Sequence, residues 1–471
     1  MNSTPPPMKP MNSNYWSVIP RKPTPLYSQI ATTYNPSVRQ QPARMAHSPQ
    51  VLPTDCRQIA GRLPSVKREN WGFELRSHGQ GAYSRARRAQ ITTPHGAIAT
   101  PAFIPVGTKA TVKALSVEQV RQGGAQAVLA NAYHLYLQPG SEILDQAGGL
   151  SQFMNWGGPT FTDSGGFQVL SLGVGFKKTL AMNPGEMSAD DVIQSPKLRL
   201  AHVDDDGVTF KSHLDGSLHR FTPEISMQVQ HQIGADIMFA FDECTTLMNT
   251  KDYQEIALER TLAWANRCIA AHKRLTTERS DKPYQALFGV IQGAQYEDLR
   301  KQAAREIAAL DFDGFGIGGA IDKNALSKIV AWVTDELPED KPRHLLGIGE
   351  PDDLFRGVES GADTFDCVAP TRNARTSAVY GPSGRFNLTV AENRTAFSPI
   401  DENCTCYTCT HYTKAYLHHL FKSKEILGAT LTTIHNVHFT VSLVDRIREH
   451  LDQENYEEFR DDFLARYYPS R

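Results

Sequence analysis

The chain has 471 residues, a formal net charge of −2, and 40% hydrophobic and 21% charged residues. A chain of this length can bury a large core, and its near-neutral charge argues against a globally cationic nucleic-acid binder while permitting a local basic patch. No run of about 18 apolar residues occurs, so we predict no membrane span.

Residues 1–70 differ in composition from the rest of the chain. They are rich in Pro, Ser, Thr, Asn and Gln, show no apolar periodicity, and hold nine Lys and Arg residues against Asp55 and Glu69. This composition predicts a disordered extension. An organelle transit peptide is the alternative, because the segment is poor in acids and contains Arg and Ser, although its many prolines would hinder an amphipathic helix.

From about residue 88, short apolar runs alternate with stretches of helical period. Continuous apolar character over a few residues is typical of strands buried on both faces, as in a parallel sheet. Leu299, Ala303 and Ile307 share one helical face, and residues 256–269 predict a longer amphipathic helix. Eight strand-then-helix units predict a (β/α)8 TIM barrel, with a doubly wound sheet as the alternative. The runs are PAFIPVGT, QAVLANAYHL, PTFTDSGGF, DIMFAFDEC, ALFGVIQG, GFGIGG, HLLGIG and DTFDCVAPT.

Polar side chains gather at the ends of these predicted strands. They are Asn131, Asp163, Asp242, Gln292 and Asp366. In a barrel of this kind, chemistry takes place at the carboxyl ends of the strands. One buried carboxylate is usually structural, since burial costs free energy unless the group is paired or functional. Three acids at one barrel mouth favour a functional site.

Two segments interrupt the repeating pattern. Residues 171–202 form an excursion with no assigned chemistry, and GVTFKSHLDGSLHRFT predicts a β-hairpin around its Asp-Gly turn.

The seven cysteines are odd in number and mostly scattered, which favours reduced cytosolic thiols over a disulfide framework. Cys404, Cys406 and Cys409 are crowded into CTCYTC, and His435 follows 26 residues after the last of them. Three thiolates and one imidazole form a closed tetrahedral zinc set, which would be structural. His411, His418, His419 and His438 compete with His435 for the fourth position.

These observations divide the chain into three predicted parts: a Pro-rich disordered extension (1–70), a (β/α)8 catalytic barrel (71–395), and a zinc-binding subdomain with C-terminal helices (396–471).

Taken together, the motifs resemble the tRNA-guanine transglycosylase family, also called queuine tRNA-ribosyltransferases. The matching segments run in family order over roughly residues 75–465, and FTDSGGFQVLSL and FDCVAPTRNAR are the most specific. The others are NAYHLYLQPG, SHLDGS, AFDECT, VIQG, GFGIGG, LLGIGEPDDL, CTCYTC and TIHN. The resemblance is closest to the bacterial, homodimeric type.

The resemblance implies a TIM barrel with a structural zinc, one per chain, held by Cys404, Cys406, Cys409 and His435. It also implies exchange of the wobble guanine of GUN anticodons for a 7-deazaguanine base, a step of queuosine biosynthesis. The implied partners are the tRNA anticodon loop, the free base and a second copy of the chain. We expect a cytoplasmic protein.

For catalysis, the family match implies Asp366 as the nucleophile and Asp163 as the general acid and base. Base exchange at a glycosidic carbon follows the logic of retaining glycoside hydrolysis, in which a carboxylate forms a covalent sugar intermediate. A proton must reach the leaving guanine and later leave the incoming base, so one acid can serve in both directions.

For the base itself, the match implies Asp242 on the N–H edge of the purine, with Gln292 and the Gly319 amide beside it. Glycine allows the backbone to approach the base, because it has no Cβ. The remaining implied contacts, besides Asp163, are Ser164, Gly165, Gly166 and Phe167. We expect the Phe167 ring to stack on the base, with core packing as the alternative.

Two loops are implied to contact RNA, whose single-stranded loops are read through splayed bases and backbone contacts. Arg372 and Arg375 suit phosphate and base edges, with surface salt bridging as the alternative. Glu350 departs from the neutral or basic residue expected there, which puts that contact in doubt. The first loop is Gly347, Ile348, Gly349, Glu350, Pro351, Asp352 and Asp353, and the second is Thr371, Arg372, Asn373, Ala374 and Arg375.

The identity of the incoming base depends on the segment after GIGG. It reads Ala320, Ile321, Asp322 and Lys323, which departs from the family's two usual forms. Ala320 would widen the pocket, and Asp322 could pair with an ammonium on either base. We favour 7-aminomethyl-7-deazaguanine, with queuine as the alternative.

Other functions fit less well. A non-catalytic tRNA-binding paralogue would lack the nucleophile, yet Asp366 and Asp163 are both present. A transglycosylase acting on DNA or another tRNA position would need a reader other than PTRNAR. A zinc-dependent hydrolase would need an open metal position.

Overall fold

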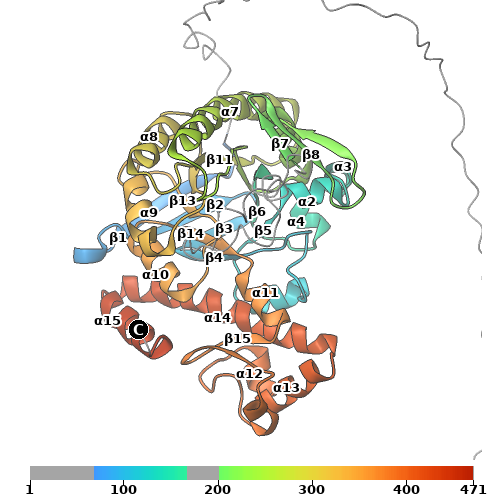
Figure 1. Cartoon of the computed structure of the whole chain (residues 1–471), viewed down its shortest axis with the longest axis vertical. Coiled ribbons are helices and arrows are strands. Elements are labelled where there is room, and N and C mark those ends of the chain that lie inside the picture. The colour runs from blue at the N-terminus through green and yellow to red at the C-terminus, as the bar shows by residue number, and fades with distance from the viewer. Residues whose placement is uncertain (1–67, 167–200, 470–471) are drawn as a thin grey trace, which may run out of the picture. The chain divides into compact units, whose positions relative to one another are not determined.

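A computed structural model describes residues 68–166 and 201–469 of the chain (Figure 1). The predictions made for residues 1–67, for Phe167 and for 171–200 lie outside these described residues.

Eight parallel strands form one sheet in the order β4-β14-β13-β12-β11-β10-β6-β5. A parallel bridge between Val106 and Leu129 joins its two edges, and Gly107 N donates to Leu129 O at 2.6 Å, so the sheet is a near-closed barrel. The barrel prediction is confirmed: seven strands fall within the predicted apolar runs, and β13 begins one residue before its run. They are β4 (Ala102–Pro105), β5 (Val128–Ala130), β6 (Thr160–Thr162), β10 (Ile237–Phe239), β11 (Ala286–Ile291), β12 (Gly314–Ile317), β13 (Arg343–Leu345) and β14 (Thr364–Cys367).

The barrel strands are buried on both faces, which explains their continuous apolar character. Phe161, Phe239 and Phe288 belong to a core inside the barrel. A larger core lies between the strands and the surrounding helices, where Ile307 and Phe315 are fully buried.

Helices surround the barrel between consecutive strands (Figure 1). Several begin at side-chain caps: Ser116 closes a capping box, and Thr222 precedes a proline that suits the first turn. The predicted helix 256–269 is longer in the structure. The helices are α1 (Val117–Gln122), α2 (Ala132–Leu137), α3 (Ser141–Gln146), α4 (Leu150–Phe153), α6 (Pro223–Ile233), α7 (Lys251–Glu278), α8 (Glu297–Ala308), α9 (Leu326–Thr334), α10 (Pro351–Glu359) and α11 (Ala369–Arg375).

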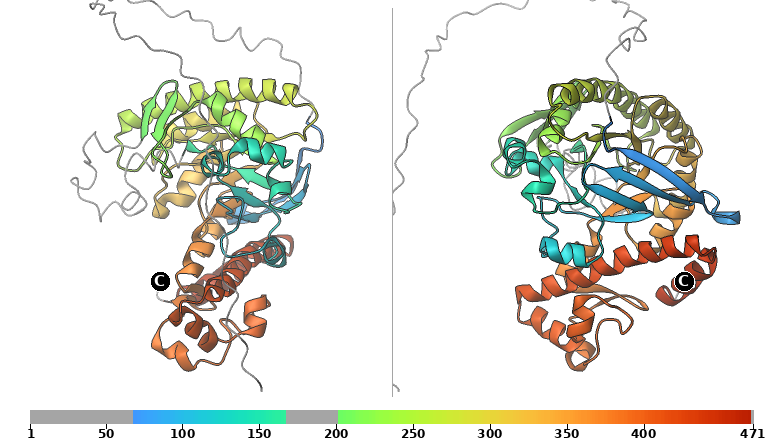
Figure 2. Two further views of the ribbon diagram at one scale, coloured as in Figure 1. Left: turned by 90° about the vertical axis from the view of Figure 1, so that its right-hand side faces the viewer. Right: turned by 180° about the vertical axis from the view of Figure 1, so that it is seen from behind.

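Strands β1 (Gly72–His78), β2 (Arg87–Thr93) and β3 (Gly96–Thr100) form an antiparallel sheet across one end of the barrel (Figure 2). Ile91 and Ile98 join the core inside the barrel, and the Trp71 ring lies 6.0 Å from that of Phe288. This sheet therefore covers the amino ends of the strands.

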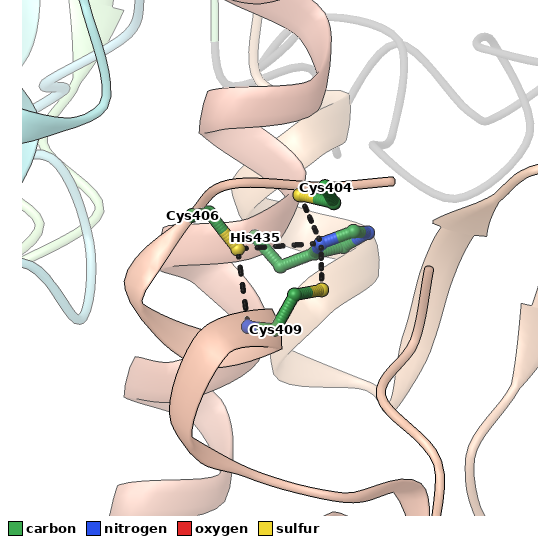
Figure 3. A group of neighbouring side chains, drawn as sticks. All are labelled: Cys404, Cys406, Cys409 and His435. Atoms are coloured by element: carbon green, nitrogen blue, oxygen red, sulfur yellow. Dashed lines mark hydrogen bonds between the residues drawn. The ribbon is translucent and has the colours of Figure 1, made fainter. Parts of the chain in front are cut away.

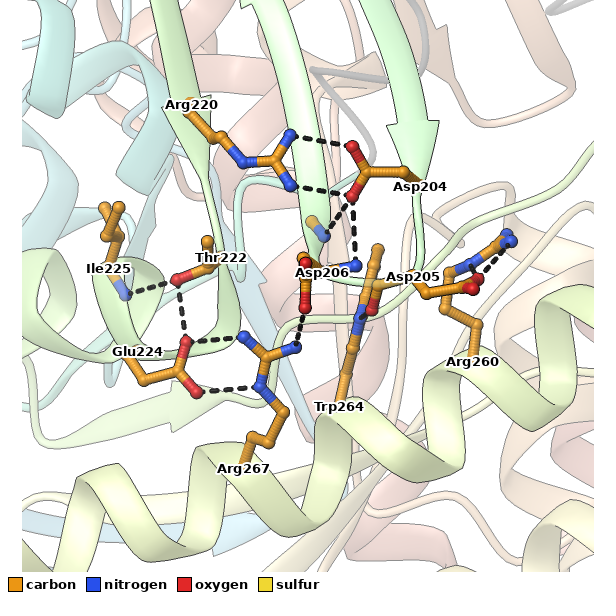
Figure 4. A network of polar contacts seen from close by, with 11 residues as sticks. Asp204, Asp205, Asp206, Arg220, Thr222, Glu224, Ile225, Arg260, Trp264 and Arg267 are labelled. Atoms are coloured by element: carbon orange, nitrogen blue, oxygen red, sulfur yellow. Dashed lines mark hydrogen bonds and ion pairs between the residues drawn. The ribbon is translucent and has the colours of Figure 1, made fainter. Parts of the chain in front are cut away.

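A second antiparallel sheet, β7 (Ala201–Asp204), β8 (Gly207–Lys211) and β9 (Leu218–Phe221), contains the predicted hairpin. Ion pairs connect its β7–β8 turn to α7 (Figure 4): Arg260 contacts Asp205 at 3.0 Å, and Arg267 contacts Asp206 at 3.7 Å. Arg260 also pairs with buried Glu243, the residue after Asp242. The hairpin is thus connected to the carboxyl end of β10.

The C-terminal elements gather on one side of the barrel (red in Figure 2), with α14 against β4 and α11. They are β15 (Ala378–Gly381), β16 (Gly384–Asn387), α12 (Tyr407–His411), α13 (Lys414–Lys422), α14 (Ile426–Asp452) and α15 (Tyr456–Tyr467). No helix within the described ranges combines the length and apolarity needed to cross a bilayer.

Candidate active site and metal centre

Asp366 lies in β14, close to its carboxyl end, and is largely buried. Its Oδ1 accepts a hydrogen bond from Gly347 N at 2.9 Å and lies 3.1 Å from His344 Nε2. Among the described residues, Oδ2 has no hydrogen-bond partner. One oxygen is therefore fixed while the other remains available.

His344 is a residue that sequence reasoning missed. It is fully buried inside the barrel between the rings of Phe161 and Phe239, at 5.6 and 5.2 Å. Its Nδ1 lies 2.8 Å from Thr364 Oγ1. If the threonine hydroxyl donates to Nδ1, Nε2 carries the proton and donates to Asp366. The period-2 pattern of β14 offered a signal, because Thr364 and Asp366 point to the same face.

Asp163 follows β6 directly and is half-buried. Ala132 N donates to its Oδ1 at 2.8 Å, and Asn131 Nδ2 donates to its Oδ2. Asn131 itself follows β5, the neighbouring strand. Two adjacent strand ends thus orient this carboxylate at the same end of the barrel as Asp366.

Asp242 lies three residues after the end of β10, is buried, and accepts hydrogen bonds from two polar side chains, which together we call the polar frame. Ser164 Oγ donates to its Oδ1 at 2.8 Å, and Gln292 Nε2 donates to its Oδ2 at 2.6 Å. Burial raises the pKa of the Asp242 carboxyl, although both hydrogen bonds oppose the shift. The structure therefore brings together three of the residues predicted to hold a base.

Gly166 and Gly319 leave space that a side chain would fill. A Cβ on Gly166 would lie 2.6 Å from Asp242 O, and one on Gly319 would lie 2.5 Å from Gln292 Oε1. Gly319 also has a φ of +92°, which favours glycine. Gln292 Oε1 is buried without a partner among the described residues. An unused hydrogen-bond acceptor therefore lies beside Gly319.

Arg300, on α8, supports this frame through hydrogen bonds to backbone carbonyls. It is a second residue that the sequence analysis did not identify. It is fully buried and has no carboxylate partner within residues 68–166 and 201–469, and burial lowers the pKa of its guanidinium to about 10. Nη1 donates to Ile291 O at 3.0 Å and to Gly318 O at 2.8 Å. One side chain therefore joins the ends of β11 and β12, next to Gln292 and Gly319.

The segment PTRNAR, expected as a loop that contacts RNA, lies in the helix α11 (Ala369–Arg375). Arg372 and Arg375 are exposed and form no ion pair with a carboxylate in the described part of the chain. Asn436 on α14 fastens this helix: its Nδ2 donates to Pro370 O at 3.1 Å and to Ala378 O at 3.0 Å, and its Oδ1 accepts from Tyr380 N at 3.2 Å.

The segment Gly347–Asp353 leads from the end of β13 into α10. Glu350, the residue that departs from expectation, forms an ion pair with Arg385 of β16 at 3.3 Å. The acid therefore has a neutralising partner on a separate element.

Cys404, Cys406, Cys409 and His435 converge in one cluster (Figure 3), and their ligand atoms all lie within 4.8 Å of one another. His435 Nδ1 lies 3.6, 3.6 and 3.3 Å from the three sulfurs in that order. Its Nε2 donates to Tyr380 O at 2.6 Å, which leaves Nδ1 free of a proton and facing the sulfurs. The donor set suits a metal ion, and the cluster indicates a metal site.

An eight-stranded parallel barrel with carboxylates and amides at the carboxyl ends of its strands defines an α/β-barrel enzyme. A family model described as Queuine tRNA-ribosyltransferase matches residues 82–469. The chain therefore belongs to the queuine tRNA-ribosyltransferase family and is a tRNA-guanine transglycosylase, a pentosyltransferase that exchanges a guanine base in tRNA.

Two curated relatives illustrate the match, and both bear the name Queuine tRNA-ribosyltransferase. The protein of Desulforamulus reducens is 46% identical over 385 residues, covering 81% of this chain and 95% of the relative. The protein of Caldanaerobacter subterraneus subsp. tengcongensis is 44% identical over 393 residues, covering 83% and 96%.

Proposed function

We propose that this enzyme exchanges the wobble guanine of GUN anticodons for 7-aminomethyl-7-deazaguanine through a covalent bond between Asp366 and the ribose. The arrangement of the Asp366 carboxylate carries this proposal: Oδ1 is held by Gly347 N at 2.9 Å, and Oδ2 has no partner in the described residues. A nucleophile needs one oriented, unengaged atom, and Oδ2 meets that requirement.

In the first half-reaction, Asp366 Oδ2 attacks C1′ of the target nucleotide. The glycosidic bond breaks, its electron pair leaves with guanine, and Asp163 delivers a proton to the departing base. In the second half-reaction, Asp163 removes a proton from the incoming base. The base nitrogen then bonds to C1′, and the Asp366 carboxylate is released.

Recognition of the base rests on the frame around Asp242. Its carboxylate would accept from the N–H edge of a purine, and the unpartnered Gln292 Oε1 and the Gly319 amide lie beside it. Leaving such buried groups unpaired is costly, so a base that lacks a matching edge is rejected.

The preference for the aminomethyl base rests on the resemblance to the bacterial type of the family, since relatives from two bacteria are 46% and 44% identical to this chain. Asp322 Oδ1 accepts from Asn324 N at 3.0 Å, which caps a short 3-10 turn and orients the carboxylate. This carboxylate would pair with an ammonium group on either base. Queuine is the alternative substrate.

Mass spectrometry of GUN-anticodon tRNA after incubation with each free base tests both the exchange reaction and the identity of the incoming base. We expect the mass change of the aminomethyl base in tRNA, and none when Asp366 is replaced by Asn. Incorporation of queuine alone would contradict the substrate assignment but leave the exchange reaction intact.

Three further assignments belong to this proposal. The Cys3His cluster binds a structural zinc, because a set of four ligands leaves no open position for catalysis. The enzyme acts as a homodimer in the cytoplasm, a compartment that suits the free cysteines of the described residues. Residues 1–70, 71–395 and 396–471 form its extension, its catalytic barrel and its zinc subdomain.

A further inference from the structure

A cavity of about 930 Å³ opens beside the segment that follows β13. Glu350 and Asp352 line it together with Arg385 of β16 and Tyr467 of α15. Gly347, three residues before Glu350, donates its amide to Asp366. The cavity therefore adjoins the loop that holds the proposed nucleophile.

Among the charged side chains in and around this cavity, the acids are more deeply buried in the protein and the cations are more exposed to solvent. The cationic side chains of Lys323, Arg356 and Arg385 are 45, 39 and 47% exposed. The acids are less exposed, at 3, 11 and 27% for Asp353, Asp352 and Glu350. The pairs are Lys323 with Asp353 at 3.5 Å, Arg356 with Asp353 and Asp352 at 3.2 and 3.6 Å, and Arg385 with Glu350 at 3.3 Å.

This layering presents positive charge to solvent although cations and acids are equal in number. An approaching anion meets the guanidinium and ammonium groups before it meets the carboxylates.

Tyr467 provides an independent observation. It is 3% exposed and lines the cavity, and its hydroxyl has no partner among the described residues. Burial raises the pKa of this phenol, so the hydroxyl stays protonated and can donate. A buried donor without a partner is costly, and an acceptor group in the cavity would relieve that cost.

We propose that this cavity binds a backbone phosphate of the tRNA near the exchanged nucleotide, with Arg385 as its principal cation and the Tyr467 hydroxyl as a donor. The inference rests on the proposed function, because it takes the RNA strand to pass over Asp366. It also explains how Glu350 is tolerated at an RNA-binding surface: Arg385 neutralises the acid and offers its remaining N–H groups to phosphate.

The test measures KM for tRNA and kcat for incorporation of labelled guanine over a range of KCl concentrations. We expect Arg385→Gln to raise KM several-fold, with the effect in KM rather than in kcat. The slope of log KM against log salt should fall by about 0.7, the value for one phosphate contact on a single strand. Tyr467→Phe, which removes only the hydroxyl, should raise KM without changing that slope.

Glu350→Gln separates phosphate binding from a purely structural ion pair. It frees Arg385 and removes an acid, so we expect KM for tRNA to fall below that of the wild type. If Glu350→Gln raises KM as much as Arg385→Gln, the pair is structural and the inference is wrong.

Arg305→Gln is the matched control, because Arg305 is an exposed arginine in the last turn of α8, paired with Glu336 at 3.0 Å. It should keep the wild-type KM and salt slope.

The remaining outcomes separate this inference from the proposed function. If inorganic phosphate binds in calorimetry through Arg385 while the tRNA KM of Arg385→Gln stays at the wild-type value, the cavity serves a free anion and the inference is wrong. Failure of the wild type to incorporate guanine would instead refute the proposed function.

Discussion

At the scale of single residues, the site consists of carboxylates in contrasting surroundings. Asp366 has one fixed oxygen and one without a partner in the described residues, whereas both oxygens of Asp242 accept hydrogen bonds in a buried frame. The first arrangement suits attack on a carbon, and the second suits recognition of N–H groups. Three substitutions test these assignments.

Asp366→Asn should leave tRNA binding intact but abolish the covalent RNA adduct, because a neutral amide is a poor nucleophile. A denaturing gel of enzyme incubated with labelled tRNA measures the adduct, and a filter-binding assay measures tRNA binding. An adduct that survives this substitution would remove Asp366 as the nucleophile.

His344→Phe should lower kcat by about tenfold to a hundredfold with little change in KM, because Asp366 loses an orienting hydrogen bond while aromatic packing is kept. Steady-state kinetics measure the change in kcat and the change in KM separately. His272→Phe is the control, since His272 on α7 is a buried histidine whose Nδ1 lies 3.0 Å from Nε2 of His231 on α6. Equal losses of kcat in both variants would indicate a general effect of removing a buried imidazole.

Asp242→Asn should raise the melting temperature at neutral pH while weakening base binding. The folded-state pKa of Asp242 lies above its ordinary value because of burial. Its contribution to stability is therefore complete below the unfolded pKa and is lost as pH rises through the folded pKa. The gain in Tm of the variant over the wild type should grow from acidic to neutral pH in thermal scans, and a gain that shrinks would contradict this account.

At the scale of elements, α14 connects the metal cluster to the arginine helix. His435 faces the three cysteines, and the next residue, Asn436, fixes both α11 and β15. Arg372 and Arg375 therefore have defined positions although they are exposed and form no ion pair with a carboxylate of the described ranges. The β7–β9 sheet is connected to the site in a similar way, since Arg260 pairs both with Asp205 of this sheet's first turn and with Glu243, the residue after Asp242.

Asn436→Ala should lower the free energy of unfolding by about 2 kcal/mol, because it leaves buried carbonyl and amide groups unpaired. It should also raise KM for tRNA, since α11 loses its attachment to α14. Chemical denaturation and exchange kinetics measure the two effects. Asn266→Ala, which removes an exposed amide that donates to Leu262 O on the same helix, should change neither quantity.

At the scale of the whole molecule, the barrel brings together side chains that are up to 235 residues apart, from Asn131 to Asp366. The C-terminal elements contribute Arg385 on β16 to the proposed RNA-binding surface, which also includes α11. Metal binding by the Cys3His cluster and the arrangement of this surface should therefore be coupled.

Cys406→Ala should reduce bound zinc and lower the melting temperature by several degrees, because structural zinc sites contribute directly to folding. Elemental analysis and thermal scans measure both quantities. Stoichiometric zinc in a stably folded variant would refute the assignment of Cys406 as a ligand.

The sequence by itself determined the barrel, the three cysteines of the metal cluster and the family, because these depend on local patterns. Buried parallel strands need continuous apolar runs, and three closely spaced cysteines can share one metal. The eight runs and the eight strands agree accordingly.

Only the tertiary structure decided which side chains support the site. His344, Arg300 and Asn436 act through partners on neighbouring strands or helices, and Glu350 is neutralised by Arg385, 35 residues away. Such pairings depend on how strands and helices align in space, and no periodicity or motif along the chain records that alignment.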